Sequence, residues 1–209
     1  MESSQQARRW IQVGIVAGLV ACVTYPIMVF VPMPRRLTLV VAASFGPALA
    51  FASVGLHRIL ALRGDSVAAQ IAALSNVIAG AIVTCMLIVQ LQVRWTNEDA
   101  GRAGQELEAM VEQVWQVVLG LDVSFDVFVG IGTLLFGLVM MGHPVFGRVV
   151  GALGVVVGGV LVLGFNVAAF PRLPVEVGLP DPGPISGLWY LLVVIQVIRG
   201  RCALMPAGE

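Results

Sequence analysis

Charge is scarce in this chain. Of its 209 residues, only 11% are Asp, Glu, Lys or Arg, whereas a soluble domain carries about 25%. Hydrophobic residues make up 58%, and the mean hydropathy is +0.95. A surface with so few charges is not suited to water. The chain is therefore predicted to be an integral membrane protein whose main partner is the lipid bilayer.

Neither sign of charge is in excess, and lysine is absent. Twelve basic residues, all of them Arg, balance twelve acidic residues. A basic excess would have indicated nucleic acid, and an acidic tract would have indicated disorder. We therefore expect no nucleic-acid partner.

Cysteine, histidine and catalytic motifs are also few. Three cysteines give no disulfide framework, and Cys22 and Cys85 lie within apolar runs, which predicts buried, unreactive thiols. There is no HExxH, GxSxG, CxxC, Walker or dinucleotide-binding pattern. His57 and His143 are expected on one side of the membrane, where shared ligation of a metal or haem is conceivable, but two interfacial histidines are the favoured interpretation. No metal, cofactor or enzymatic activity is predicted.

Long apolar runs dominate the sequence. An apolar helix of about 20 residues crosses ~30 Å of hydrocarbon, and breaker-rich links such as VPMPRR (31–36) and GHPVFG (142–147) separate these runs. The predicted fold class is all-α: a polytopic transmembrane helical bundle, one domain over residues 1–209, with about six spans. The predicted spans lie near 11–31, 37–60, 71–93, 121–142, 147–170 and 185–199.

Two of these spans have unusual ends. The segment 185–199 is short and crosses the bilayer only if Arg199 and Arg201 snorkel to the surface. Before the fourth span, apolar residues recur every three or four positions and predict an amphipathic outer helix near 103–118. Gly120 lies between this outer helix and the fourth span. If the helix continues through Gly120, the acidic residues of the outer helix and of the fourth span align on one face; if Gly120 interrupts the helix, they do not.

The distribution of arginine sets the expected orientation. With the N-terminus inside, the cytoplasmic set is Arg8, Arg9, Arg58, Arg63, Arg148, Arg199 and Arg201, and the outer set is Arg35, Arg36, Arg94, Arg102 and Arg172. The larger number of arginines on the cytoplasmic side agrees with the positive-inside rule. We therefore expect a multi-pass protein of the cell inner (plasma) membrane, with both termini in the cytoplasm.

A stripe of glycine marks the fifth predicted span. Gly147, Gly151, Gly154 and Gly158 recur on one helical face. In lipid, helices associate through close backbone contact, which small residues permit. We expect this stripe to serve helix packing within the chain; an interface that forms a homo-oligomer is the alternative.

Two carboxylates, Asp122 and Asp126, stand at the head of the predicted fourth span. An ionised carboxylate at mid-bilayer costs roughly 2.5–3.5 kcal/mol on insertion scales. The favoured interpretation is that both begin the helix at the water boundary, where the positive end of the helix dipole stabilises them. The alternative is that Asp126 faces the bundle interior and carries a proton or binds a cationic ligand, with Arg94 and Arg102 as candidate partners.

Asn76 and Asn166 complete the candidate set for a ligand or proton site. Interhelical hydrogen bonds are the usual role of such groups in membranes. Both residues lie near the ends of their predicted spans, on opposite sides of the membrane. They are therefore not expected to converge on one site, and a packing role is favoured.

The second half of the chain has a recognisable order of features. The stretch LDVSFDVFVGIGTLLFGLVMMGHPVFGRVVGALGVVVGGVLVLGFNVAAF, followed by GLWYLLVVIQVIR, joins an acidic start, a Gly- and Leu-rich span, a short basic turn, a Gly-rich span and a closing helix with Trp. In this order it resembles the bacterial six-helix membrane family called domain of unknown function 4386, mainly over residues 121–199. The resemblance implies a six-helix bundle and no established activity or site.

Three functional hypotheses follow. The first is binding of a lipid or small apolar molecule between helices, with Asp122 and Asp126 at the outer mouth. The second is a small proton- or ion-coupled transporter built from two halves of three helices. The third is a membrane interaction subunit that docks through the glycine stripe of the fifth span.

Overall fold

The computed structural model describes residues 4–99 and 105–204, and every regular element in these ranges is a helix. Six helical spans are long and apolar enough to cross a membrane, which confirms the predicted all-α bundle. The spans are α1 (Ser4–Phe30), α2 (Arg35–Ala61), α3 (Val67–Asp99), α4 (Gln105–Met140), a fifth made of α5 (Gly147–Val155), a π-helical segment (Val156–Gly164) and α6 (Phe165–Ala169), and α7 (Pro182–Leu204). A short 3-10 helix, Pro174–Val177, lies between α6 and α7.

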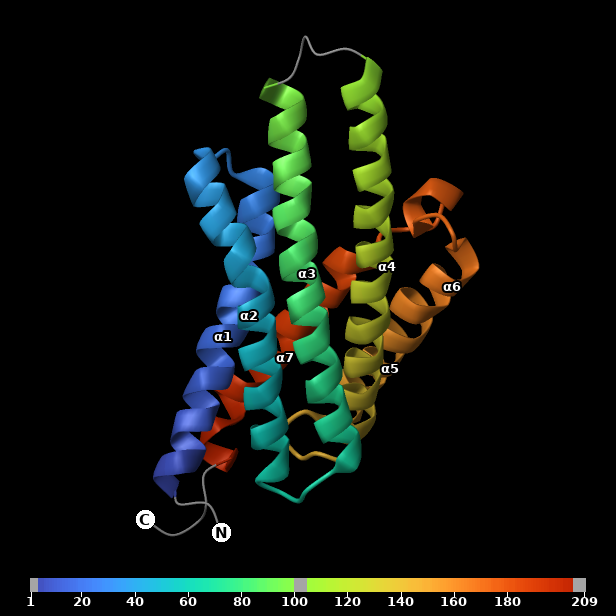
Figure 1. Ribbon diagram of the computed structural model, residues 1–209. Coiled ribbons are helices and arrows are strands. Elements are labelled where there is room, and N and C mark those ends of the chain that lie inside the picture. The colour runs from blue at the N-terminus through green and yellow to red at the C-terminus, as the bar shows by residue number, and fades with distance from the viewer. Residues whose placement is uncertain (1–3, 100–104, 205–209) are drawn as a thin grey trace.

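The spans form a closed ring in chain order. Each span packs extensively against its neighbours in the sequence, and α7 packs against both the fifth span and α1. The first residues of α1 and the last residues of α7 lie at the same end of the ring, which we call the terminal end (Figure 1). We call the opposite end, where α1 leads into α2, the distal end.

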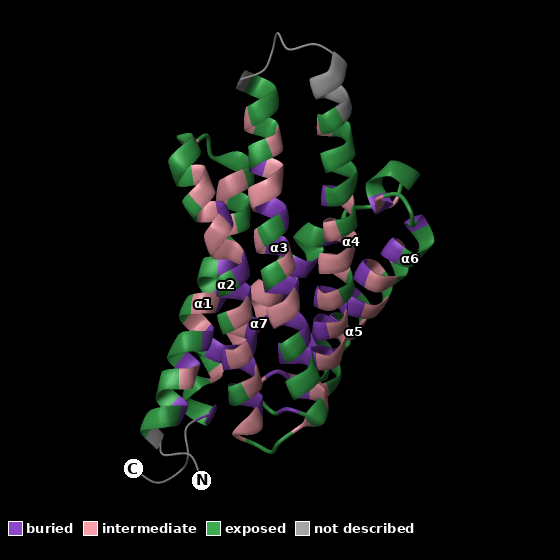
Figure 2. Ribbon diagram, in the orientation of Figure 1, coloured by how far each residue is buried: buried purple, intermediate pink, exposed green. Residues whose placement is uncertain are grey.

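Two of the helices are much longer than a bilayer requires. α3 has 33 residues and α4 has 36, so at 1.5 Å per residue they are about 50 and 54 Å long, against ~30 Å of hydrocarbon. Both extend beyond the other spans at the distal end (Figure 1). Their distal parts are largely exposed, whereas buried residues concentrate inside the ring (Figure 2).

The predicted outer helix and the fourth span are one continuous helix. α4 passes through Gly120 without a break, because a single glycine costs only about 1 kcal/mol in a helix interior. Residues 103 and 104 of the predicted outer helix lie outside the described residues. The glycine therefore does not separate the acidic residues before it from those after it.

The prediction that Asp122 and Asp126 begin a helix is wrong. α4 begins at Gln105, so Asp122 lies more than four turns after its first residue. The helix dipole acts within the first turn, so it does not stabilise either carboxylate. Their presence in α4 needs another physical explanation.

The sixth span is longer than the predicted segment 185–199. α7 begins at Pro182 and has 23 residues, or about 34 Å. Arg199 and Arg201 lie within its last turns, so the expectation that they snorkel to the surface still stands. Proline is well tolerated in the first helical turn. The Asp181 carboxylate accepts a hydrogen bond from the Gly183 amide at 2.8 Å, so the start of the helix is capped.

Three of the four stripe glycines, Gly151, Gly154 and Gly158, face inward. A Cβ at Gly158 would collide with the Leu134 amide nitrogen on α4, and one at Gly154 would collide with the Trp189 ring on α7. These positions therefore allow the fifth span to approach two neighbouring helices closely. The inward direction favours packing within the chain and removes the flat outer face that the interaction-subunit hypothesis required.

Gly147 does not belong to this packing surface, so its predicted packing role is wrong. A Cβ at this position would meet nothing within 4 Å. Its φ is +72°, a left-handed conformation that glycine adopts without steric cost. Gly147 is the first residue of α5 and makes the turn from α4.

Replacement of Gly158 by Ala is expected to destabilise the protein by roughly 1–3 kcal/mol, because the added methyl group overpacks a backbone contact. The measurement is denaturant unfolding of the purified protein in detergent. Gly120→Ala is the matched control, since a Cβ there meets nothing within 4 Å and Ala favours the helix by up to about 1 kcal/mol. Equal stability of the two variants would contradict the inward packing of the stripe.

Candidate functional site

Asp126 and Asn166 meet near the distal end of the ring. The Asn166 Nδ2 on α6 donates to Asp126 Oδ2 on α4 at 2.8 Å and to the Val162 carbonyl oxygen at 2.9 Å. Asn166 is only 4% exposed, and its Oδ1 has no hydrogen-bond partner within the described residues. Asp126 is half-buried. The carboxylate therefore faces a neighbouring helix, as the alternative interpretation of the sequence required.

Two more carboxylates surround this pair. Asp122, half-buried, lies one turn nearer the distal end on α4. Asp181, which precedes α7, is close enough to interact electrostatically with both Asp122 and Asp126, and Tyr25 on α1 interacts with all three. We call Asp122, Asp126, Asp181 and Asn166 the distal acidic site. Asp181 was missed in the sequence because it lies in a proline-rich link with no motif around it.

The distal acidic site has no basic partner in the part of the chain that the structure describes. Arg35 and Arg94 instead form ion pairs with Glu98, at 3.3 Å and 2.9 Å. The prediction that Arg94 pairs with the aspartates is therefore wrong, and Arg102 lies outside the described residues. Among residues 4–99 and 105–204, the three aspartates therefore have no basic side chain paired with them.

Asn76 belongs to a different cluster, as the sequence predicted. Its Nδ2 donates to Ser53 Oγ at 3.0 Å and to Tyr190 Oη at 2.8 Å, and the Tyr190 and Thr133 hydroxyl groups lie 3.0 Å apart. This central polar cluster joins α2, α3, α4 and α7 through side chains of which Ser53, Asn76 and Thr133 are at most 1% exposed. Nothing in the sequence indicated that Thr133 and Tyr190 would meet.

The Asn76 side chain has no room beside it for a ligand. Its Oδ1 has no hydrogen-bond partner within the described residues, but it lies directly against Gly132 on α4, where a Cβ would collide with it. Contacts of this kind between a Cα–H and an oxygen are weakly favourable. The central polar cluster is therefore a closed packing element, and Asn76 does not belong to the distal acidic site.

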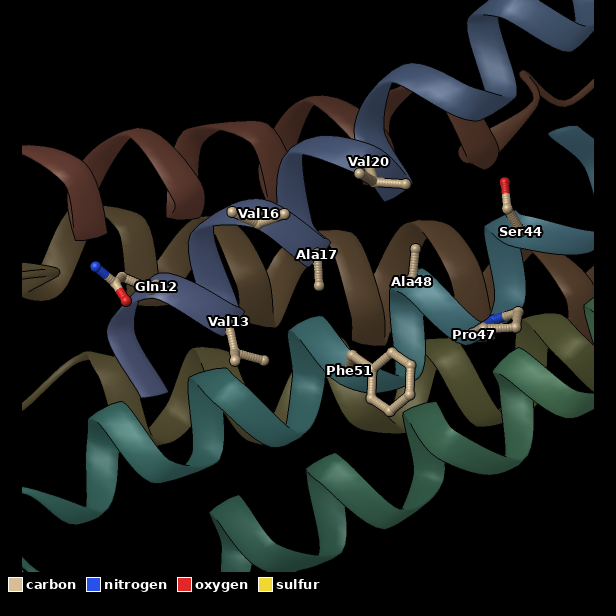
Figure 3. Close-up of a pocket in the computed structure, with 9 residues that line it drawn as sticks. All are labelled: Gln12, Val13, Val16, Ala17, Val20, Ser44, Pro47, Ala48 and Phe51. Atoms are coloured by element: carbon tan, nitrogen blue, oxygen red, sulfur yellow. The ribbon is translucent and has the colours of Figure 1, made fainter. Parts of the chain in front are cut away.

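An apolar groove of about 550 Å³ lies between α1 and α2. Figure 3 shows Ala17 and Ala48 between the two helices, with Val13 and Phe51 beside them. The lining residues are Gln12, Val13, Val16, Ala17, Val20, Ser44, Pro47, Ala48 and Phe51. The groove includes none of the polar residues singled out in the sequence, so the predicted apolar pocket with the aspartates at its mouth is not formed there.

The two histidines lie at the terminal end, on the same side as predicted. Burial, and then the positive charge of Arg63, lowers the pKa of His143, so its ring is neutral at pH 7. Within the described residues, no group of three or more His, Cys, Asp or Glu side chains could hold a metal ion. Cys85 and Cys202 are exposed, which contradicts the prediction of a buried thiol at Cys85, because that side of α3 faces outward.

No family model, curated protein or solved structure matches this chain. The resemblance to the family called domain of unknown function 4386 therefore stays a prediction. Functional inference depends on the geometry of the chain itself.

Replacement of Tyr190 by Phe is expected to destabilise the protein, because the hydroxyl group holds both Asn76 and Thr133. Interhelical hydrogen bonds in membranes are worth about 0.6 kcal/mol on average and up to about 1.7 kcal/mol, so a loss of roughly 1–3 kcal/mol is expected from denaturant unfolding. Tyr25→Phe is the control, since the Tyr25 hydroxyl group forms no hydrogen bond within the described residues. Equal effects of the two changes would refute the structural role of the central polar cluster.

Proposed function

We propose that this chain is an integral membrane protein that binds the acyl chain of a lipid, or a similarly apolar molecule, in the groove between α1 and α2. The observation that carries the proposal is the groove itself, which is about 550 Å³ and lined almost entirely by apolar side chains. Ligand pockets are typically ~300–1,000 Å³ and mostly apolar, with few polar groups. Here the polar lining groups are Gln12 and Ser44.

The position of the groove favours an occupant from the bilayer. Only 17% of the apolar stretch of α1 is buried inside the protein, against 28–50% in the other spans. Val16 and Phe51, both in the groove lining, are each 62% exposed. Pro47 removes a backbone donor from the middle of α2, and a proline at such a position bends a helix. An exposed apolar groove beside a bent helix suits a flexible hydrocarbon chain.

We also propose that the protein resides in the plasma membrane with its terminal end in the cytoplasm. Seven of the described arginines lie at or near that end, and four lie toward the distal end. This distribution agrees with the grouping expected from the sequence, and the positive-inside rule supports the orientation.

A proton- or ion-coupled transporter is the second candidate. It is favoured by the contact of Asp126 with Asn166 between two spans, since ionisable groups inside membrane helices commonly mark ion or proton pathways. The contact alone supplies no pathway across the bilayer. Lipid binding in the groove therefore remains the leading proposal.

Photo-crosslinking with a phospholipid that carries a diazirine in one acyl chain tests the groove. In liposomes, adducts are expected to concentrate in residues 12–20 and 44–51 when peptides are mapped by mass spectrometry. Ala17→Phe fills the groove and is expected to reduce these adducts by about tenfold, the loss expected if roughly 1.4 kcal/mol of binding free energy is removed.

Leu74→Phe is the control for the crosslinking experiment. It adds a similar ring to a side chain of α3 that is 60% exposed and lies outside the groove. Labelling should match that of the unaltered protein. Uniform labelling of all lipid-facing helices, unaffected by Ala17→Phe, would show that the groove is not a binding site.

Cysteine labelling tests the orientation. With Cys22 and Cys85 replaced by Ala, Cys202 remains exposed near the end of α7. A membrane-impermeant maleimide should leave it unlabelled in intact cells and label it in inverted vesicles. Thr96→Cys with Cys202→Ala, near the distal end of α3, should show the reverse pattern; the same accessibility at both positions would contradict the proposed topology.

A further inference from the structure

The distal acidic site is separate from the groove and carries an unbalanced charge. It combines Asp122 and Asp126 from α4, Asp181 before α7 and Asn166 from α6. No salt bridge is formed by these aspartates within residues 4–99 and 105–204. Partly buried carboxylates are normally paired with a cation, so the arrangement favours a positive partner, which the described side chains do not supply.

The Asn166 side chain adds an independent indication of a ligand. Its Nδ2 is used by Asp126 and by the Val162 carbonyl oxygen, which leaves Oδ1 buried and without a partner. Buried polar atoms in folded proteins almost always have a hydrogen-bond partner. This oxygen belongs to the same amide group that contacts Asp126, so an unpartnered acceptor lies next to the carboxyl group.

The spacing of the acidic groups selects the type of cation. Three carboxylates interact electrostatically, yet no group of three or more metal-ligating side chains in the described chain could hold one metal ion. A cation with several N–H donors suits separated oxygen acceptors better than a single metal ion, which needs its ligands at about 2.0–2.6 Å. Ammonium groups supply three such donors.

The residues around Asp126 indicate the chemical character of the ligand beyond its ammonium group. Phe125 and Leu121 on α4 pack against the apolar cluster inside the distal half of the ring, together with Phe45. Asp181 is exposed and Asp122 and Asp126 are half-buried, so the site leads from water toward apolar side chains. We propose that the distal acidic site binds an organic ammonium ion that carries an apolar chain.

Equilibrium binding of radiolabelled decylammonium tests this site. The protein is placed in phosphatidylcholine nanodiscs, empty nanodiscs are subtracted, and n-decanol serves as the neutral counterpart. We expect saturable binding of decylammonium and none of decanol. Asp126→Asn should weaken binding by about tenfold or more, because a charge-assisted hydrogen bond is lost.

Two further variants keep the result interpretable. Asp122→Asn removes a carboxylate for which no hydrogen bond is recorded in the described chain, so it should fold normally and weaken binding to a smaller degree than Asp126→Asn. Glu112→Gln changes an exposed carboxylate on the same helix that accepts a bond from Gln116 at 3.0 Å, and it should bind decylammonium as the unaltered protein does. Unchanged binding in both aspartate variants would overturn the proposal.

The groove variant separates this proposal from the proposed function. Ala17→Phe should leave decylammonium binding intact, since Ala17 lines the groove and not the distal acidic site. If Ala17→Phe abolished binding while Asp126→Asn did not, the probe would be entering the groove by its alkyl chain, and the ammonium site would be refuted. Saturable binding of decanol equal to that of decylammonium would refute it as well.

Discussion

Close contact between helix backbones is the constraint on which this bundle depends. Lipid is as apolar as the helix surfaces, so helices in a bilayer are held by packing rather than by escape from water. Glycine faces glycine between three pairs of neighbouring spans: Gly14 and Gly55, Gly46 and Gly80, and Gly137 and Gly151. A methyl group on any of these glycines except Gly14 would collide with backbone atoms of the facing helix. The pairing of neighbouring spans in the ring therefore depends on the positions of glycine, which has no side chain to hold the helices apart.

The buried polar groups divide into two sets with different physical roles. In the central polar cluster, Tyr190 joins Asn76 and Thr133, and the neutral groups largely satisfy one another. Such a network ties four spans together and needs nothing from outside. At the distal acidic site three of the groups are carboxyl groups, and Asn166 offers Asp126 one donor while no basic side chain pairs with them within the described residues. Only the second arrangement leaves carboxyl groups without a basic partner in the described residues, which is why we propose a ligand there.

The two proposed binding regions differ in polarity and in exposure. The groove lies on the least buried span and is almost wholly apolar, so hydrocarbon can enter it from the side. The distal acidic site uses Asp122 and Asp126 of α4, which are half-buried, and Asp181, which is exposed. An amphiphile presents both kinds of surface. The two proposals therefore assign separate regions of the chain to an apolar chain and to a positive head group.

The sequence by itself determined the all-α class and the six spans, through its hydropathy. Arginine positions predicted the arginine-rich terminal end, and glycine spacing predicted the packing role of Gly151, Gly154 and Gly158. Each of these features depends on a single segment and its lipid surroundings, not on which distant segments meet. The sequence did not reveal that α4 begins at Gln105, since propensity alone does not show whether Gly120 ends a helix. Nor did it pair Asp126 with Asn166, 40 residues apart, or Asn76 with Tyr190, 114 residues apart. Those contacts depend on which faces of distant helices meet, and only the packing of the closed ring decides that.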